Sequence, residues 1–141
     1  MVGKTINEIS IGETASYSKT ITETDVYLFA GISGDINPAH LNEEVSQKGI
    51  FGTRVVHGIL TSGLISAVLG VWLPGPGTIY LGQDLLFKKP VKINETITAE
   101  VKAIEKDTNK NIMKFETICK NQNQDIVIEG IATVMPPKKE I

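Results

Sequence analysis

Three polar residues stand close together in the stretch SGDINPAH, residues 33–40. Asp35 and His40 are separated by Asn37 and Pro38. A carboxylate and an imidazole held beside one reacting centre can take a proton from one atom and give a proton to another, which is general acid–base catalysis. Proline stiffens such a loop and fixes where the side chains point. The same residues are also typical of a polar turn, so the spacing alone leaves both interpretations open.

A metal site at this loop has little support from the sequence. An EF-hand loop would need Asp or Asn where Ala39 stands and Gly where His40 stands. One Asp and one His make a poor zinc or iron site unless His57 joins them. We therefore predict that no metal is bound here.

A second candidate region is VVHGILTSGLIS, residues 55–66, in which His57 and Gly58 open an apolar segment. At the start of a helix, free backbone N–H groups and the helix dipole suit an oxygen that is gaining negative charge. Glycine lets a substrate carbonyl approach the backbone closely. A packing role for Gly58 is the alternative interpretation.

The chain as a whole has the composition of an ordinary soluble domain. Its 141 residues predict a single domain, residues 1–141, large enough to bury a real core. A net charge of −2 gives no reason to expect nucleic acid or a membrane as a partner. The one cysteine, Cys119, excludes an intrachain disulfide and a cysteine-based zinc site. The start, MVGKTINEISIG, lacks the apolar core of a signal peptide, so we expect a cytoplasmic protein.

The elements that must position the two motifs alternate along the chain. Apolar periodicity and turn residues predict a strand at 14–21, a helix from 23 to 34 capped by Thr22, a loop at 33–41, a short helix at 42–49 and a long helix at 57–72. After the turn at 73–78 the apolar residues recur with a period of two residues. This predicts strands at 78–91, 97–103, 113–119 and 126–134, with hairpin loops at 107–111 and 121–125 and a polar tail at 136–141.

The segment from Val55 to Pro74 contains no Asp, Glu, Lys or Arg and is long enough to span a bilayer. Half-buried antiparallel strands, however, need an apolar partner to cover one face. We therefore predict an α+β fold with a curved antiparallel sheet around this buried helix. The exposed edge of such a sheet predicts a homodimer or a dimer of dimers.

Three segments together resemble a known family: YLFAGISGDINPAH, VVHGIL and LPGPGTIYLGQDLLFKKPV. They are similar to the MaoC-like dehydratases, the R-specific enoyl-CoA hydratases of the hot-dog fold, and the similarity runs from Thr14 to Val134. The resemblance implies a sheet wrapped around a long helix and a dimer whose sheets join edge to edge. It implies a reversible syn hydration of a trans-2-enoyl-CoA to a (3R)-3-hydroxyacyl-CoA, without metal or redox cofactor.

The resemblance also implies roles for particular residues. Asp35 and His40 match the catalytic pair, with Asp35 favoured as base and His40 as acid. Asn37 would orient the pair or the water, His57 would support the loop, and the Gly58 amide would stabilise the enolate oxygen.

The substrate contacts expected from the resemblance lie elsewhere. Ser66 would lie near the acyl chain. Separately from the resemblance, Leu69 stands three residues after Ser66 on the same helix face, and with Val134 on the last strand it would close the acyl pocket and restrict it to short chains such as crotonyl-CoA. Arg54, Lys88 and Lys89 are candidates for contact with CoA phosphates, although each is also a plausible solvated side chain.

Other functions stay open at this point. A thioesterase of the hot-dog fold would bind acyl-CoA but direct water to C1, and a non-catalytic acyl-thioester-binding module would retain the fold alone. An acyl carrier protein could replace CoA as the carrier.

Overall fold

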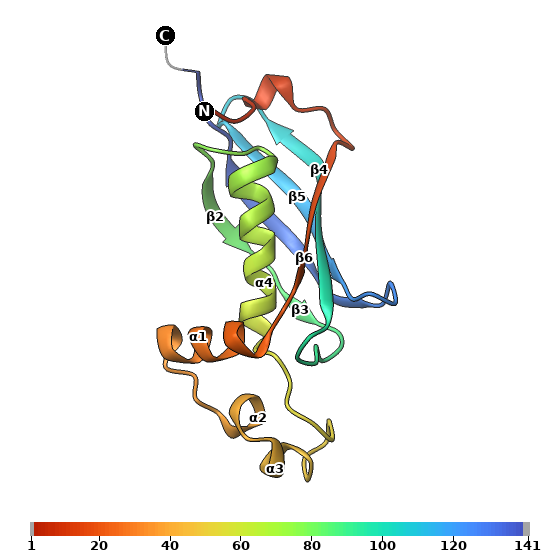
Figure 1. The fold of residues 1–141 in the computed structure, drawn as a ribbon. Coiled ribbons are helices and arrows are strands. Elements are labelled where there is room, and N and C mark those ends of the chain that lie inside the picture. Colours follow the sequence, from red (N-terminus) through yellow and green to blue (C-terminus); the bar gives the residue numbers. More distant parts are fainter. Residues whose placement is uncertain (1, 140–141) are drawn as a thin grey trace.

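The computed structural model describes residues 2–139, in which one sheet and the long helix α4 form the body of the protein (Figure 1). In chain order the elements are a 3₁₀ turn at Ile6–Glu8, β1 Thr14–Thr20, α1 Glu23–Ser33, α2 Pro38–Leu41, α3 Glu43–Ser46, α4 Gly58–Ala67, a π-helical turn at Val68–Trp72, β2 Ile79–Gln83, β3 Leu86–Phe87, β4 Thr96–Asp107, β5 Ile112–Lys120 and β6 Ile126–Met135.

Every strand pairing in the sheet is antiparallel, in the order β1-β4-β5-β6-β2, and β3 pairs separately with β6. Side chains alternate between the two faces, as the two-residue period predicts. On β4, Ile97, Ala99 and Val101 are fully buried, and on β5 so are Met113 and Phe115. The predicted alternation is confirmed for these two strands.

Helix α4 packs against β4 and β5 and supplies the other half of the core. Ile65, Val68 and Leu69 on α4 and the π-helical turn are almost completely inaccessible. Burying each such side chain contributes about 1.5–3 kcal/mol. The uncharged segment is therefore a core helix, and no helix within residues 2–139 has the length and apolarity needed to cross a membrane. This is the predicted α+β arrangement of a curved sheet around one helix, the hot-dog fold.

Three sequence predictions need correction. The strand expected at 78–91 is split into β2 and β3, because the Asp84 carbonyl approaches the backbone of Gly130 so closely that a Cβ there would lie 1.8 Å away. The loop expected at 33–41 contains the helical turn α2. The expected polar tail is in part packed: Pro136 and Pro137 are buried, and Pro136 accepts a hydrogen bond from the side chain of Asn111. The last two tail residues lie outside the described range.

Helices α1, α2 and α3 lie together beyond one end of the sheet, next to the start of α4 (Figure 1). Thr22 caps α1, since its hydroxyl accepts from the Asp25 amide while the Asp25 carboxylate accepts from the Thr22 amide. Gly34, with φ of 80°, ends α1 in the left-handed conformation that glycine adopts readily. The loop carrying Asp35 therefore leaves α1 in a defined direction, toward α4.

Candidate active site

The loop after α1 is held by its own polar side chains. The Ser33 hydroxyl accepts from the Asp35 amide (3.1 Å), and the Asp35 carboxylate accepts from the Asn37 amide (3.3 Å). The Asn37 side chain accepts from the Ala39 amide (3.0 Å) and so caps α2. Asn37 thus fixes the loop through its backbone N–H and as the cap of α2, while the orientation of the pair or the water by its side chain stays a prediction.

His40 projects from α2 and is tied to the segment that precedes α4. Its Nδ1 lies 2.6 Å from the Val55 carbonyl oxygen, which can only accept, so Nδ1 carries the proton. The Val55 amide donates in turn to the Ala39 carbonyl (3.1 Å). The remaining nitrogen, Nε2, faces the Asp35 carboxylate at 3.9 Å. This gap is too long for a direct hydrogen bond, and one water molecule can contact both groups.

His57 connects the two halves of this pair. Its Nε2 donates to the backbone carbonyl of Asp35 (2.9 Å), and its ring stacks on that of His40 with the centroids 3.8 Å apart. The ring of Phe29 packs against it, and His57 is only 2% exposed. Nδ1 of His57 has no partner within the described residues and stands at the positive end of α4.

Ligand atoms of Asp35, His40 and His57 lie within 4.8 Å of one another, which raises the question of a metal centre. Both imidazoles donate one N–H to a backbone carbonyl. Because a nitrogen lone pair lies in the plane of its ring, two stacked rings do not direct their remaining nitrogens at a common point. The donor set does not fit the tetrahedral or octahedral geometry of metal sites.

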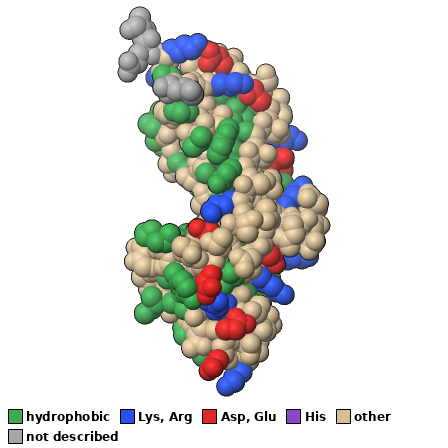
Figure 2. Space-filling model, in the orientation of Figure 1, with side chains coloured by type: hydrophobic (Ala, Val, Ile, Leu, Met, Phe, Trp, Pro, Cys, Tyr) green, Lys and Arg blue, Asp and Glu red, His purple; other side chains and the backbone are tan. Residues whose placement is uncertain are grey.

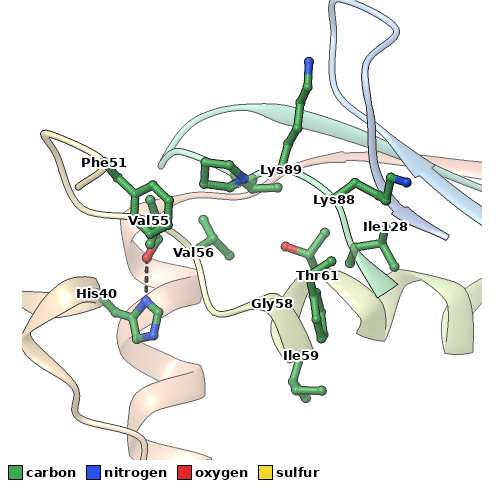
Figure 3. A pocket seen from close by; sticks show the side chains of 13 residues that line it. His40, Phe51, Val55, Val56, Gly58, Ile59, Thr61, Lys88, Lys89 and Ile128 are labelled. Carbon is green, nitrogen blue, oxygen red and sulfur yellow. Dashed lines mark hydrogen bonds between the residues drawn. The ribbon is translucent and has the colours of Figure 1, made fainter. Parts of the chain in front are cut away.

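A cavity of about 450 Å³ opens beside His40 and the start of α4 (Figure 3). Its walls are mostly apolar and come from the segment before α4, from α4, and from the chain between β3 and β4. It is lined by His40, Phe51, Val55, Val56, Gly58, Ile59, Thr61, Phe87, Lys88, Lys89, Pro90, Val91 and Ile128. A mostly apolar pocket with a few polar groups is typical of a small-molecule site.

Gly58 is the first residue of α4 and lies in the wall of this cavity. A Cβ at this position would stand 2.6 Å from the ring of Phe87, so any other residue requires that ring to move. The N–H groups of the first helical turn have no partner inside the helix and can donate to a ligand. Gly58 therefore lies in the wall of the cavity that His40 also lines, and its role as a donor to a substrate oxygen stays a prediction.

Lys88 and Lys89 also line the cavity, as the predicted contact with CoA requires. Each already faces a carboxylate across a long ion pair: Lys88 and Glu129 are 3.5 Å apart, as are Lys89 and Asp125. Both lysine side chains are about half exposed, so these pairs are weak and can yield to a phosphate.

Arg54, in contrast, does not line the cavity. Its guanidinium lies 2.9 Å from Glu23 and 3.4 Å from Glu43, and it also donates to the Tyr27 hydroxyl. The hydrogen bond with Glu23 raises the pKa of Arg54, while the Tyr27 hydroxyl and then Arg54 lower the pKa of Glu23. This geometry disagrees with the predicted contact between Arg54 and CoA phosphates. Arg54 joins α1 and α3 to the segment before α4.

Three predicted acyl-chain contacts also lie away from the cavity. Leu69 and Val134 are fully buried within the core between α4 and the sheet, and Ser66 is exposed on the outer side of α4. Residues three apart share a face in a regular α-helix, which suggested a shared pocket. The π-helical turn at Val68–Trp72 begins between Ser66 and Leu69 and changes the rotation per residue, so the two side chains point in different directions.

The sequence interpretation missed the cavity residues Phe51, Thr61 and Phe87. Two of them could have been predicted from the sequence. Phe87 immediately precedes the predicted Lys88 in the same segment, and Thr61 stands three residues after Gly58, on the same face of a helix. Phe51 reaches the cavity through a loop whose course no local pattern indicates.

Comparisons with known proteins agree with this geometry. The profile of a family described as MaoC-like domain matches residues 7–124. The chain is 51% identical to an (R)-specific enoyl-CoA hydratase of Rhodospirillum rubrum, over 94% of this chain and 91% of that protein. It is 41% identical to a 3-hydroxybutyryl-CoA dehydratase of Methylorubrum extorquens, over 94% and 84%. The unliganded structure of R-hydratase PhaJ1 from Pseudomonas aeruginosa matches with a TM-score of 0.92 and 40% identity, covering 99% of this chain and 89% of that one.

Proposed function

The chain belongs to the family of MaoC-like domains, and on that premise we propose that it is a hydro-lyase that catalyses the reversible hydration of a trans-2-enoyl-CoA to a (3R)-3-hydroxyacyl-CoA. One observation carries the proposal: Asp35 and His40 face each other at 3.9 Å, with His40 and Gly58 lining one cavity. A thioesterase needs water directed at C1. Asp35 and His40 instead suit the addition of a water oxygen to C3 and of a proton to C2.

In the hydration direction, the water held by Asp35 and His40 forms a bond from its oxygen to C3. One member of the pair takes a proton from the water, and the other gives a proton to C2, so the double bond becomes a single bond and the pair as a whole gains no charge. His40 can act only through Nε2, because its Nδ1–H is donated to Val55. With Asp35 as base, His40 enters the reaction as an imidazolium whose acidic proton lies on Nε2.

As the new bond forms at C3, negative charge develops on the thioester oxygen. We assign the Gly58 amide to this oxygen, where a preorganised donor stabilises an enolate-like transition state. Lys88 and Lys89 are assigned to the CoA phosphates, since they line the same cavity and are half exposed. No metal or redox cofactor is needed for this sequence of proton transfers.

A short acyl chain is the proposed substrate. The name of the Methylorubrum extorquens relative, a 3-hydroxybutyryl-CoA dehydratase, supports a four-carbon chain. Crotonyl-CoA is therefore the first compound to test.

We also propose that the protein is a homodimer. Strand β2 ends the sheet, and its edge is free to pair with a second copy within the residues described. Apolar side chains are exposed near it and along α4, including Ile59, Val71, Trp72, Ile79 and Leu81. Figure 2 shows hydrophobic side chains gathered on the face that carries α4 in Figure 1. Both features suit an interface between copies. Light scattering that gives the mass of a monomer at micromolar concentration would contradict this.

The decisive experiment follows the loss of enoyl-thioester ultraviolet absorbance after crotonyl-CoA is added, with chiral analysis of the product. We expect (3R)-3-hydroxybutyryl-CoA and no release of free thiol. Free CoA thiol without hydration would instead indicate a thioesterase.

A further inference from the structure

Thr61 combines complete burial with an unused hydroxyl group. The residue has no exposed surface, and its Oγ1 has no hydrogen-bond partner within the described residues. A threonine inside a helix usually bonds the carbonyl four residues earlier. Here that carbonyl, on His57, accepts only from the Thr61 amide (3.2 Å). A buried hydroxyl without a partner costs free energy, and valine has the same shape without that cost.

The other buried hydroxyl residues of residues 2–139 are satisfied. Thr117, equally inaccessible, donates to the Gly130 carbonyl (2.9 Å) and accepts from the Gln83 side chain (2.9 Å). Ser46 donates to the Pro38 carbonyl (3.1 Å). The unpaired hydroxyl of Thr61 is therefore an exception that folding alone does not explain.

The position of Thr61 indicates what the hydroxyl serves. It lines the same cavity as His40 and Gly58, and it stands three residues after Gly58 on α4. Helical side chains lean toward the N-terminus, so the Thr61 side chain covers the turn that begins at Gly58. In Figure 3 its oxygen is directed to the side where Val56 lies and away from Ile128. The walls around it are mostly apolar, so a polar atom of a bound ligand is the partner that this cavity can offer.

We propose that the Thr61 hydroxyl is a second donor to the thioester oxygen of the substrate, beside the Gly58 amide. The inference rests on the proposed hydratase function and adds a catalytic residue to it. Oxyanion sites gain most from paired donors that are fixed before the reaction, because the donors need no reorganisation as charge develops. The Thr61 hydroxyl has no partner to give up within the described residues, and because it is closed to solvent in the free protein, a shift of the cavity wall on substrate binding must expose it.

The test compares Thr61→Val with Thr61→Ser. Valine removes the hydroxyl at constant shape, and we expect it to lower kcat/KM for crotonyl-CoA by about 10²-fold, the cost of one oxyanion donor. The melting temperature should stay the same or rise, because no internal hydrogen bond is lost. Serine retains the donor and should stay within about tenfold of the unmodified enzyme.

Thr117→Val is the matched control. It removes a hydroxyl that is bonded within the protein and does not line the cavity, so it should lower the melting temperature and leave kcat/KM unchanged. Wild-type kcat/KM in Thr61→Val would overturn the proposal. A lower melting temperature in Thr61→Val, with no rescue by serine, would overturn it as well, because the hydroxyl would then be structural.

A second measurement separates this proposal from the hydratase function. Acetoacetyl-CoA forms an enolate whose near-ultraviolet absorbance reports the charge on the thioester end of the ligand. The unmodified protein and Thr61→Ser should increase the enolate fraction of bound acetoacetyl-CoA, and Thr61→Val should not. If crotonyl-CoA is not hydrated at all, the proposed function fails, while equal enolate fractions in Thr61→Val and the unmodified protein would refute the role of Thr61.

Discussion

Asp35 and His40 form a pair whose two members are held by different means. The Asp35 side chain is about half exposed and receives only the Asn37 amide, whereas the His40 side chain is largely enclosed and donates to Val55. The carboxylate is free to move toward a water, and the imidazole is fixed. If both act on one water in one transition state, their contributions to the rate must be coupled.

Substitution of the pair tests this coupling. Asp35→Asn and His40→Gln should each lower kcat by about 10²–10⁴-fold, with KM for crotonyl-CoA nearly unchanged. The double variant should be little slower than either single variant, because groups that act as a unit are not additive. Steady-state kinetics of the three variants gives the answer. Full activity in Asp35→Asn would make residues 33–40 an ordinary turn.

His57 allows its hydrogen bond and its ring to be tested separately. His57→Gln keeps a donor for the Asp35 carbonyl and loses the stack on His40, while His57→Phe keeps the stack and loses the donor. We expect kcat to fall about 10²-fold in the Phe variant, because Asp35 loses its anchor, and to stay within about tenfold in the Gln variant. Equal losses in the two variants would show that the hydrogen bond does not position Asp35.

At the scale of elements, the start of α4 and strand β3 meet at one tight contact. Gly58→Ala would ordinarily favour a helix, but here the new Cβ meets the Phe87 ring at 2.6 Å. We expect urea unfolding to show a loss of about 1–3 kcal/mol. Replacing Phe87 by Leu in the same chain should recover part of it, because the two positions are in contact. Strictly additive effects would contradict the contact.

The sequence was sufficient to predict most of the elements. The uncharged helix, strands β4 and β5 and both hairpin loops follow from periodicity, because half-buried elements must repeat their apolar residues with the period of their backbone. The break between β2 and β3 depends on one close approach to Gly130, which no local pattern encodes. The same holds for α2, whose four residues are too few for a periodic signal.

The site was predicted in part for related reasons. Asp35, His40 and Gly58 belong to short motifs, and the residue types in these motifs indicate which chemistry they can support. The contact of His57 with Asp35 spans 22 positions, and the partners of Arg54 lie 11 and 31 positions away. Such contacts depend on how α1 and α3 fold back over α4, so the sequence left Arg54 open as a CoA contact.

At the scale of the whole molecule, the buried thiol of Cys119 and the partly enclosed hydroxyl of Tyr80, a residue that is 37% exposed, set how the protein responds to alkali. Burial raises the pKa of Cys119 to about 12 from an ordinary 9.0, and that of Tyr80 to about 12 from 10.0. Both groups are neutral in the folded protein at a pH where the unfolded chain has already lost their protons. Their contribution to stability is therefore complete below about pH 9 and is lost as the pH rises toward 12.

Melting temperatures measured at about pH 8 and about pH 10.5 test this linkage. We expect a marked fall between the two for the unmodified protein and a smaller fall for Cys119→Ala, which lacks the ionisable thiol. The alanine variant is less stable at both values because it leaves a small cavity. An identical fall in the two proteins would remove Cys119 as the cause.

The helices beyond the end of the sheet are expected to unfold at a lower temperature than the sheet itself. Residues 23–46 contain few buried side chains: in this segment Val26, Ala30 and Ser46 are buried. Their attachment relies on the bonds of His40, His57 and Arg54, so this segment can open locally while the sheet stays intact. Amide hydrogen exchange should therefore be fast in the segment and slow in β4–β6. The one tryptophan stacks on Tyr17 of β1, so its fluorescence follows the sheet and will report a folded protein at temperatures where turnover has already stopped.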